Sequence, residues 1–444
     1  MSDMLSIGAS GLRAYQTALT TVSENIANAG TPGYVRRTAA LTEVAAPGVE
    51  AGLNGMGVVV SGVNRAGDPF RANEVRMASA DLAKSETAAT WLDRIEGALT
   101  GDKLGDRLTA FFNSTNAVAA DPSAIAPRAA MLEAAASAAS AFTGTGNALA
   151  AAASDLDASA DAAVSQLNAL AAGLAKVNAG LGRTAPGTAG ASALTDQRDQ
   201  LLEAMSAIVD VSANFDTAGR ATLRVGGSSG PVLVSGESTG TVTHVDNSEG
   251  AISFAVYRNG EASVLAPSAG ALAGMVEGAQ RIAAARVEID AIATAFVDGV
   301  NSVQAGGRDL AGAPGDAMLE ARDSPTAINV VLSDPRGIAA AASDGGPRDN
   351  RNLAGFISLR NSGGFETGVT NIVMANASAL SARTSVSEAQ TAIRDNAVAA
   401  RDSATGVNID EEAVDLLRFQ QAYQASARVI QIARETLQTM LDIK

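Results

Sequence analysis

Apolar residues spaced three and four apart mark an amphipathic helix near each end of the chain. The N-terminal stripe consists of Leu5, Gly8, Leu12, Tyr15, Leu19, Val22 and Ile26. The C-terminal stripe consists of Ile409, Ala413, Leu416, Gln420, Tyr423, Ala427, Ile430, Arg434, Leu437 and Leu441. This spacing places each set on one helix face. Because isolated helices of this length are marginal in water, we predict that both stripes need a packing partner.

Local signals set the inner ends of these two helices. Gly30 suits a left-handed helix cap, and Pro32-Gly33 fits the middle of a type II turn, so the first helix should stop near Ala29. Asn408 is the expected N-cap of the last helix, with Glu411 as its capping-box partner. Gln420 and Arg434 interrupt the C-terminal stripe and are candidates for fixing helix register.

Helical periodicity also dominates the middle of the chain. It runs from about Phe70 to Leu99 and on to a break at Asp121-Pro122. A heptad pattern follows in Phe142, Leu149, Leu156, Ala163, Leu170 and Val177. At ~1.5 Å per residue this segment should be on the order of 70 Å long, with Gly144 and Gly146 as places where it could bend.

Strand patterns occur in two places. Residues 38–70 contain short β-like runs, including the three valines at 58–60. Between residues 209 and 265, alternating runs are separated by turn residues, and Asn259-Gly260 is a strong hairpin signal. Helical spacing returns at 271–303, a loop-rich region follows at 306–365, and helix resumes at 365–404. The β segment is therefore expected to be an insertion in a helical framework.

These patterns predict a mainly α chain with an inserted small β domain. The expected shape is an elongated multi-domain rod with paired, coiled-coil-like N- and C-terminal helices. The terminal helices would occupy 1–38 and 405–444, and the helical rod domain, with short strands, 39–208 and 266–404. The inserted outer β domain would occupy 209–265.

Composition narrows the classes of partner. Hydrophobic residues make up 47% of the chain but aromatic residues only 3%, which favours long, closely approaching helices. The formal net charge of −15 disfavours nucleic acid and anionic membrane as partners. No run of 18 apolar residues and no basic segment followed by an apolar one is present, so we expect export, if any, without a cleaved signal peptide.

Candidate chemistry is sparse. Cysteine is absent and His244 is the only histidine, so neither a metal site nor a catalytic triad is expected. The glycines of GLNGMG at 52–57 run into a strand rather than opening a helix, which disfavours a phosphate site. We therefore expect no cofactor and no enzyme activity. A rival class, an enzyme such as a peptidoglycan hydrolase, would need an acid or nucleophile constellation that the sequence does not show.

The entropy cost of ordering the two terminal segments predicts that they fold on assembly. Ordering roughly 65 terminal residues costs about 1 to 2 kcal/mol each in backbone entropy. A bare contact between two helices does not offset that cost, whereas burial among many copies could. The terminal segments are therefore expected to be disordered alone and to fold on assembly.

The two ends together resemble the axial proteins of the bacterial flagellum. The N-terminal stretch is SGLRAYQTALTTVSENIANAGTPGYVRR and the tail is GVNIDEEAVDLLRFQQAYQASARVIQIARETLQTML. Internal segments narrow the match to the hook-associated protein 1 family: GVVVSGVNRAGDPF at 57–70, ADPSAIAPR at 120–128, LTDQRDQLLEAMSAIVDVS at 194–212 and VLSDPRGIAAA at 331–341.

This resemblance implies a structural protein at the hook–filament junction. The expected partners are other copies in a ring, the hook protein, hook-associated protein 3 and a flagellar export chaperone at the C-terminal helix. The expected location is the extracellular flagellum, and the remaining alternative is another axial component, a hook or rod protein. Compared with longer relatives, the chain is expected to lack an extra outer domain.

The resemblance and the two stripes together predict subunit-contact residues. The family pattern implies Leu12, Leu19, Asn25, Asn28, Thr31, Pro32, Gly33 and Tyr34 at the N-terminus, and Glu411, Leu417, Gln420, Gln421, Tyr423 and Leu437 at the C-terminus. The apolar stripes add Leu5, Tyr15, Val22, Ile26, Leu416, Ile430 and Leu441.

Overall fold

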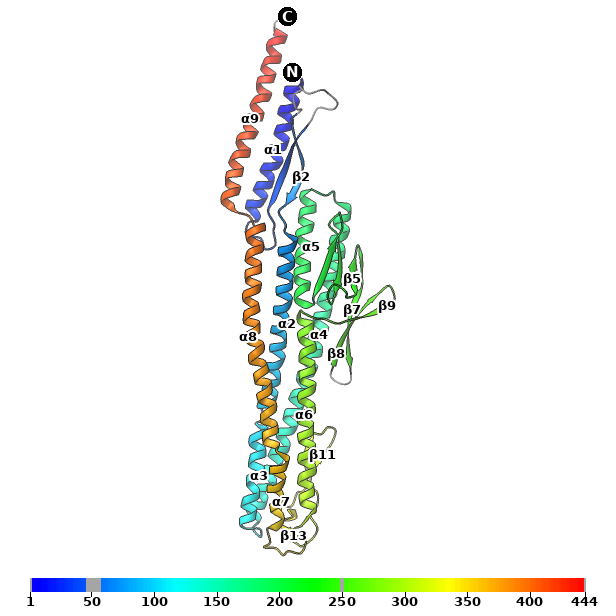
Figure 1. Ribbon diagram of the computed structural model, residues 1–444, viewed down its shortest axis with the longest axis vertical. Helices are drawn as coiled ribbons and strands as arrows, with labels where there is room; N and C mark the ends of the chain where they lie inside the picture. Colours follow the sequence, from blue (N-terminus) through cyan, green and yellow to red (C-terminus); the bar gives the residue numbers. More distant parts are fainter. Residues whose placement is uncertain (1, 45–56, 248–250, 443–444) are drawn as a thin grey trace.

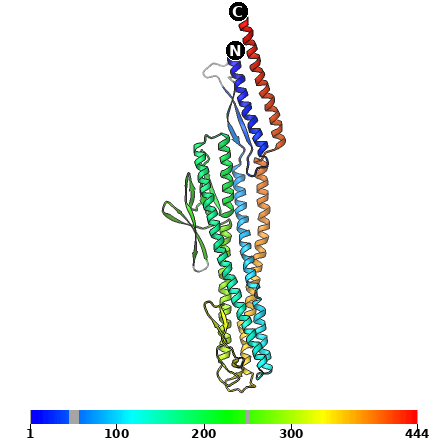
Figure 2. The same cartoon turned by 180° about the vertical axis from the view of Figure 1, so that it is seen from behind.

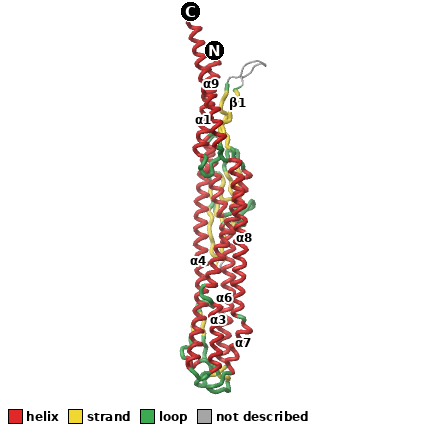
Figure 3. The backbone as a smooth tube through the Cα atoms, turned by 90° about the vertical axis from the view of Figure 1, so that its left-hand side faces the viewer, coloured by secondary structure: helices red, strands yellow, loops and turns green. Residues whose placement is uncertain are grey.

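The molecule is a long, narrow rod with both chain ends at the same tip (Figure 1). The computed structural model describes residues 2–44, 57–247 and 251–442. The first and last helices form the upper section, a bundle of long helices forms the body, and loops and short strands close the far end. A view from the side shows the same narrow outline (Figure 3). The predicted fold class, an elongated mainly α rod with a small β insertion, is confirmed.

Long helices form most of the described chain. They are α1 (Ser2–Asn28), α2 (Pro69–Thr100), α3 (Leu104–Ala120), α4 (Ile125–Arg183), α5 (Ala189–Ile208), α6 (Ala271–Ala305), α7 (Ala354–Gly363), α8 (Phe365–Thr405) and α9 (Ile409–Asp442), with two short 3₁₀ turns, η1 (Pro335–Gly337) and η2 (Arg351–Leu353). Among the described residues, no helix is long and apolar enough to cross a bilayer.

The longest helix, α4, is unbroken over its 59 residues. At ~1.5 Å per residue it is roughly 90 Å long. The helix continues through Gly144 and Gly146 without a break, and a bend at these glycines stays a prediction. A side chain at either position would collide with Asp102 or Thr326, respectively, so the two glycines allow neighbouring segments to approach the helix.

Helix α2 lies at the centre of the bundle, with α4, α5, α6 and α8 packed around it. Small residues make these contacts close. A Cβ atom at Gly274 of α6 would lie 2.6 Å from the Lys84 carbonyl oxygen, and one at Gly278 would lie 2.7 Å from Cβ of Trp91. The low aromatic and high alanine content is thus matched by tight helix spacing in the body.

Aromatic side chains concentrate instead at the far end of the rod. Phe111 and Phe296 lie 5.3 Å apart between ring centroids and meet edge to face, while Phe112 stacks on Phe365 at 5.8 Å. Phe142 and Phe356 complete a cluster of six phenylalanines from five helices. Edge-to-face and stacked pairs of this kind add to the apolar area they bury.

The strands form small antiparallel sheets. They are β1 (Arg37–Glu43), β2 (Val58–Arg65), β3 (Val211–Phe215), β4 (Ala221–Val225), β5 (Val232–Ser235), β6 (Ser238–Thr239), β7 (Thr241–Asn247), β8 (Ala251–Arg258), β9 (Glu261–Leu265), β10 (Gly307–Arg308), β11 (Leu319–Ala321), β12 (Ile328–Val330) and β13 (Ala341–Ala342). Between α5 and α6 the strand orders are β3-β4-β5-β6 and β7-β8-β9. These two sheets stand on one side of the helices (Figure 2).

Two asparagines on α4 fix both sheets to the rod. The Asn178 side chain donates to the Ala221 carbonyl at 2.9 Å and accepts from the Ala221 amide at 2.8 Å. Asn168 makes the equivalent pair of bonds to Val242. The predicted hairpin is present: Asn259 and Gly260 join β8 to β9 with φ of 52° and 84°. We propose 209–265 as a domain on this basis, with the terminal and rod segments bounded as predicted from the sequence.

The turn after α1 follows the predicted sequence signals only in part. Gly33 has a φ of 75° and the Tyr34 amide donates to the Thr31 carbonyl, as expected for the turn at Pro32-Gly33. The expectation that Gly30 is left-handed is wrong. The Thr31 amide instead donates to the Asn28 carbonyl at 2.9 Å, so a tight right-handed turn satisfies the end of the helix.

Candidate functional site at the terminal helices

Helices α1 and α9 pack side by side in opposite directions at one tip of the rod (Figure 1). The contact uses small residues of α1: Gly8, Gly11, Ala14 and Ala18 are buried. A Cβ atom at Gly8 would lie 2.6 Å from Cγ1 of Ile430, and one at Gly11 would lie 2.7 Å from Oγ of Ser426. The two backbones therefore approach closely, as small residues at a helix interface permit.

The buried face of α1 is rotated from the predicted stripe. Val22 is 5% exposed, but Leu5, Leu12, Leu19 and Ile26 are only half-buried at the edge of the contact. Tyr15 packs against Phe419 of α9, with ring centroids 6.3 Å apart. The larger apolar side chains of α1 are thus left partly open, since the small ones occupy the seam.

Helix α9 leaves still more apolar surface in solvent. Seven of its large residues are between 37% and 66% exposed: Ile409, Val414, Leu417, Tyr423, Ile432, Leu437 and Met440. Leu416 and Ile430 are half-buried, Ile430 beside Gly8 of α1, whereas Gln420 and Arg434 are exposed. The side chain of Leu441 lies outside the described part of the chain. At 3.6 residues per turn the seven exposed residues are distributed around the helix and are not confined to one stripe. We call them together the α9 apolar face.

A buried polar cluster holds the base of the helix pair. Asn25 is fully buried; its amide nitrogen donates to the Arg37 carbonyl at 2.7 Å and to Glu412 Oε2 at 2.9 Å. Its carbonyl oxygen accepts from the Tyr34 hydroxyl at 2.9 Å and from the Arg37 amide at 3.0 Å. One side chain thereby joins α1, the following turn, β1 and α9.

Glu412 is the acidic centre of this cluster. It is 1% exposed and accepts a bond of 2.6 Å from Nε of Arg36. This bond, more than any other contact, raises the pKa of the Arg36 guanidinium. Burial raises the pKa of the neighbouring Tyr34 hydroxyl. Because a buried carboxylate requires a partner, Arg36 and Asn25 stabilise the first turn of α9 at this position.

A second ion-pair cluster connects the helix pair to the rod. Asp196 of α5 is 6% exposed and lies between Arg37 at 2.8 Å and Arg65 at 2.6 Å. Arg65 also pairs with Asp199 at 2.8 Å. Arg37 and Arg65 face each other across the β1–β2 register. The β1–β2 hairpin therefore places both guanidinium groups beside one carboxylate, and these ion pairs hold the hairpin against α5.

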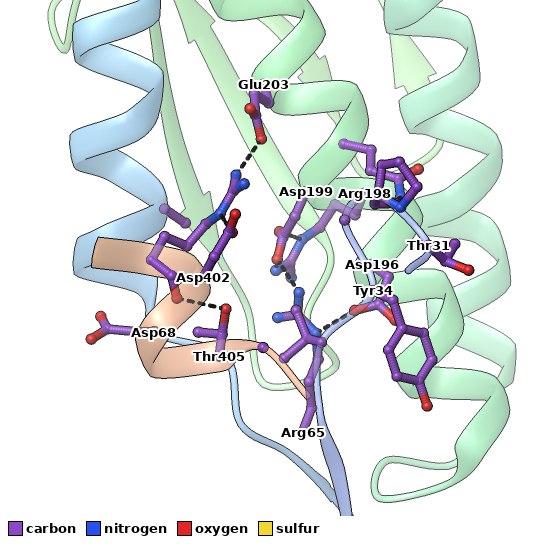
Figure 4. Close-up of a pocket in the computed structure, with 18 of the residues that line it drawn as sticks. Thr31, Tyr34, Arg65, Asp68, Asp196, Arg198, Asp199, Glu203, Asp402 and Thr405 are labelled. Atoms are coloured by element: carbon purple, nitrogen blue, oxygen red, sulfur yellow. Dashed lines mark hydrogen bonds and ion pairs between the residues drawn. The ribbon is translucent and has the colours of Figure 1, made fainter. Parts of the chain in front are cut away.

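A cavity of about 510 Å³ opens beside this second cluster. Its wall includes Thr31, Tyr34, Asp68, Glu203 and Thr405, so it lies between the turn after α1, the upper ends of α2 and α8, and the middle of α5 (Figure 4). Among the described residues, no group of three or more His, Cys, Asp or Glu could hold a metal ion.

The other predicted contact residues lie in varied surroundings. Asn28 is half-exposed and donates to the Glu24 carbonyl, while Thr31, Pro32 and Gly33 form the exposed turn. Glu411 and Gln421 are exposed on α9. Asn408 caps α9 through a bond from the Asp410 amide. Contacts with other subunits remain a prediction for all of these residues.

Sequence reasoning missed the residues that build the two clusters. None of Arg37, Arg65, Asp196 and Glu412 is among the predicted contact residues, although Arg65 and Asp196 lie within the segments 57–70 and 194–212. The segments 120–128 and 331–341 also meet: Arg128, 1% exposed, donates to the carbonyls of Pro122 and Ile338. Charged residues inside the family-like segments were the available signal.

Comparison with known proteins identifies the family. The family model described as "Flagellar hook-associated protein FlgK helical domain" matches residues 90–319, more than half of the chain. The chain belongs to this family. The ends match two further models, "Flagella basal body rod protein" over residues 5–34 and "Flagellar basal body rod FlgEFG protein C-terminal" over residues 401–443.

Curated relatives carry the name flagellar hook-associated protein 1. The one from Escherichia coli K12 is 24% identical over 550 aligned positions, covering 100% of both chains, and the one from Bacillus subtilis 168 is 27% identical over 497, covering 97% of this chain and 96% of its own. A relative from Salmonella typhimurium is 29% identical over 326 positions. That match covers 71% of this chain and spans only 59% of the Salmonella protein's length.

A solved structure supports the same fold. The flagellar hook junction protein FlgK from Burkholderia pseudomallei superposes with a TM-score of 0.50 at 19% identity, covering 56% of this chain and 47% of that one. The resemblance to hook-associated protein 1 inferred from the sequence is confirmed by these matches.

Proposed function

We propose that this FlgK-family chain is a structural subunit of the bacterial flagellum at the junction between hook and filament. The observation that carries the proposal is the α9 apolar face, whose seven large side chains are exposed to solvent. Large apolar side chains gathered on one helix, rather than scattered singly over the surface, mark a protein-binding surface. The family match to a hook-associated protein supports a structural rather than a catalytic role.

The expected assembly follows from the position of this face. Both ends of the chain lie at one tip of the rod (Figure 1), so copies arranged around an axis could bring their α1–α9 pairs together as an inner wall. Contacts repeated around and along the axis would build a tube. The proposed partners are further copies of the chain, the hook protein on one side and hook-associated protein 3 on the other, with an export chaperone on α9 before assembly. The proposed site is the extracellular flagellum, reached without a cleaved signal.

The matches of both ends to rod-protein models keep a second candidate open, another axial component such as a rod or hook protein. The helical middle matches the hook-associated family instead. Locating the tagged chain on isolated flagella separates the two. A band between hook and filament supports the proposal, whereas signal within the basal body supports the rival.

Charges placed on the α9 apolar face test the proposal. Leu417→Asp and Leu437→Asp alter residues 58% and 43% exposed, so each should change the chain's own stability by no more than about 0.5 kcal/mol. In a strain lacking its own copy, we expect the double variant to be produced but not incorporated, and filaments not to grow. Gln424→Asp adds a charge at an exposed polar position of the same helix and should leave growth intact. Normal filaments from the double variant would refute the role given to this face.

A further inference from the structure

The cavity beside the second ion-pair cluster contains one arginine that stands apart from the others. Arg65 is paired with Asp196 and Asp199, and Arg198 with Asp199 at 2.6 Å. Arg401 is paired with Glu203 at 2.8 Å and with Asp402 at 2.9 Å. Figure 4 shows these acidic groups around the cavity. Three of the arginines on its wall are therefore neutralised by direct contacts.

The fourth arginine of the wall, Arg76 of α2, makes no ion pair with a described residue, although it is only 7% exposed. Its one hydrogen bond goes to Asn73 Oδ1 at 3.3 Å, a long contact. Burial lowers the pKa of its guanidinium, and Asp199 and Glu203 act on it only from beyond ion-pair distance. A buried cation without a partner is costly, so such a group is a candidate for binding a ligand of opposite charge.

The acidic groups of the same wall are already engaged. Asp196, Asp199, Glu203 and Asp402 are each bonded to one or more arginines. Asp68 accepts from the amides of Phe70 and Arg71 as the N-cap of α2. A cavity of about 510 Å³ has room for a small molecule or for a side chain from another chain.

We propose that this cavity is a binding site for a small oxyanion, a carboxylate or phosphate group, held by the guanidinium of Arg76. The planar guanidinium has five donors and matches both groups in geometry. The oxyanion would come either from solution or from an acidic side chain of a second copy. The binding site does not depend on the role proposed for the α9 apolar face.

Thermal unfolding of the full chain tests the site, with sodium phosphate and sodium malonate as probes in a chloride buffer of constant ionic strength. A ligand that binds only the folded state raises the melting temperature as its concentration increases. We expect a concentration-dependent rise for the wild type and its loss in R76M and R76Q. In chloride alone both variants should be at least as stable as the wild type, because they remove an uncompensated buried charge.

R71M is the matched control. Arg71 lies on the same helix but is exposed and paired with Glu74 at 2.9 Å. Phosphate also stabilises proteins generally by exclusion from their surface. The effect of the site is therefore the difference between R76M and R71M in the rise of melting temperature on adding phosphate. Calorimetric titration of phosphate into the wild type, R76M and R71M gives a second measure of binding, one that does not depend on unfolding.

A second series of melting-temperature measurements, at several protein concentrations and without phosphate or malonate, identifies the source of the oxyanion. A wild-type melting temperature that rises with protein concentration, and fails to rise in R76M, assigns the site to an acidic side chain of another copy. A response to the free probes in dilute protein assigns it to a dissolved anion. If the melting temperatures of R76M and R71M respond alike in both series, the proposal is wrong. It is also wrong if R76M is markedly less stable than the wild type in chloride.

Discussion

Single polar residues decide how the terminal helices meet the rod. From α1, Asn25 bonds to groups on three other segments, and Glu412 brings α9 to Arg36. Each bond alone contributes modestly to stability, but a buried group left without its partner is penalised by about 1 to 3 kcal/mol. The geometry of the joint is therefore specified by groups that have no alternative partner in the interior.

Asn25→Ala should loosen this joint without unfolding the rod. The substitution leaves the buried Glu412 carboxylate and the Arg37 amide each short of a bond, so we expect local opening to become easier by about 2 to 4 kcal/mol. Hydrogen exchange should accelerate in residues 20–28 and 410–416 and stay unchanged in α4. Gln16→Ala, at an exposed position of α1, is the control. Equal exchange in the two variants would contradict the role given to Asn25.

At the scale of elements, small residues set which helix faces meet. In α1 the glycines and alanines occupy the seam and the leucines lie beside it, although hydrophobicity alone points to the leucines. The same rule operates in the body, where Gly274 and Gly278 bring α6 against α2. Close backbone approach maximises the many small dispersion contacts between two helices. In α1 it leaves the larger side chains free for other contacts.

An engineered disulfide can test the α1–α9 contact in the isolated chain, which has no native cysteine. A Cβ atom at Gly11 would lie 3.3 Å from Cβ of Ser426, close to the separation of about 3.5 to 4.5 Å in disulfides. We expect G11C/S426C to form an intramolecular bond under mild oxidation. G11C paired with Gln420→Cys, on the exposed side of α9, should not.

Crosslinking would be visible as a change in gel mobility that reducing agent reverses. Failure of G11C/S426C to crosslink in dilute chain, with formation only in assembled material, would mean that the two helices pair only on assembly. That result would favour the expectation of terminal segments that are disordered alone.

At the scale of the whole molecule, stability should be uneven along the rod. The body surrounds α2 with other helices and the far end contains the phenylalanine cluster, whereas α9 has a neighbouring helix on one side only. Segments with few buried apolar contacts open first. The terminal pair is therefore expected to be the least stable part of the free chain and to gain most from added neighbours.

Limited digestion with trypsin should reveal this gradient. Arg418, Arg428 and Arg434 of α9 should be cut early, while Arg281 and Arg286, which are also exposed but lie on α6, should resist. Mass spectrometry would identify a persistent fragment that retains α2 to α8. In assembled flagella the α9 sites should become protected. Cleavage of α6 as fast as α9 in the free chain would contradict a stability gradient.

The sequence alone determined the order and type of most elements. Periods of 3.6 and 2 depend on local geometry, so the long helices, the inserted strands and the Asn259-Gly260 turn could be predicted without knowledge of neighbours. Likewise the turn at Pro32-Gly33 followed from residue chemistry. The terminal and internal motifs pointed to the family because they lie in contiguous segments.

Tertiary structure decided the rest, because burial depends on partners that are distant in sequence. Only packing against α9 and the β1–β2 hairpin selected the small-residue face of α1. Only the fold brought Asn25 to Glu412, the hairpin arginines to Asp196, and Arg128 to the carbonyl of Ile338. A charge in a sequence has many possible partners, and the three-dimensional arrangement of α5, α9 and the hairpin selects among them.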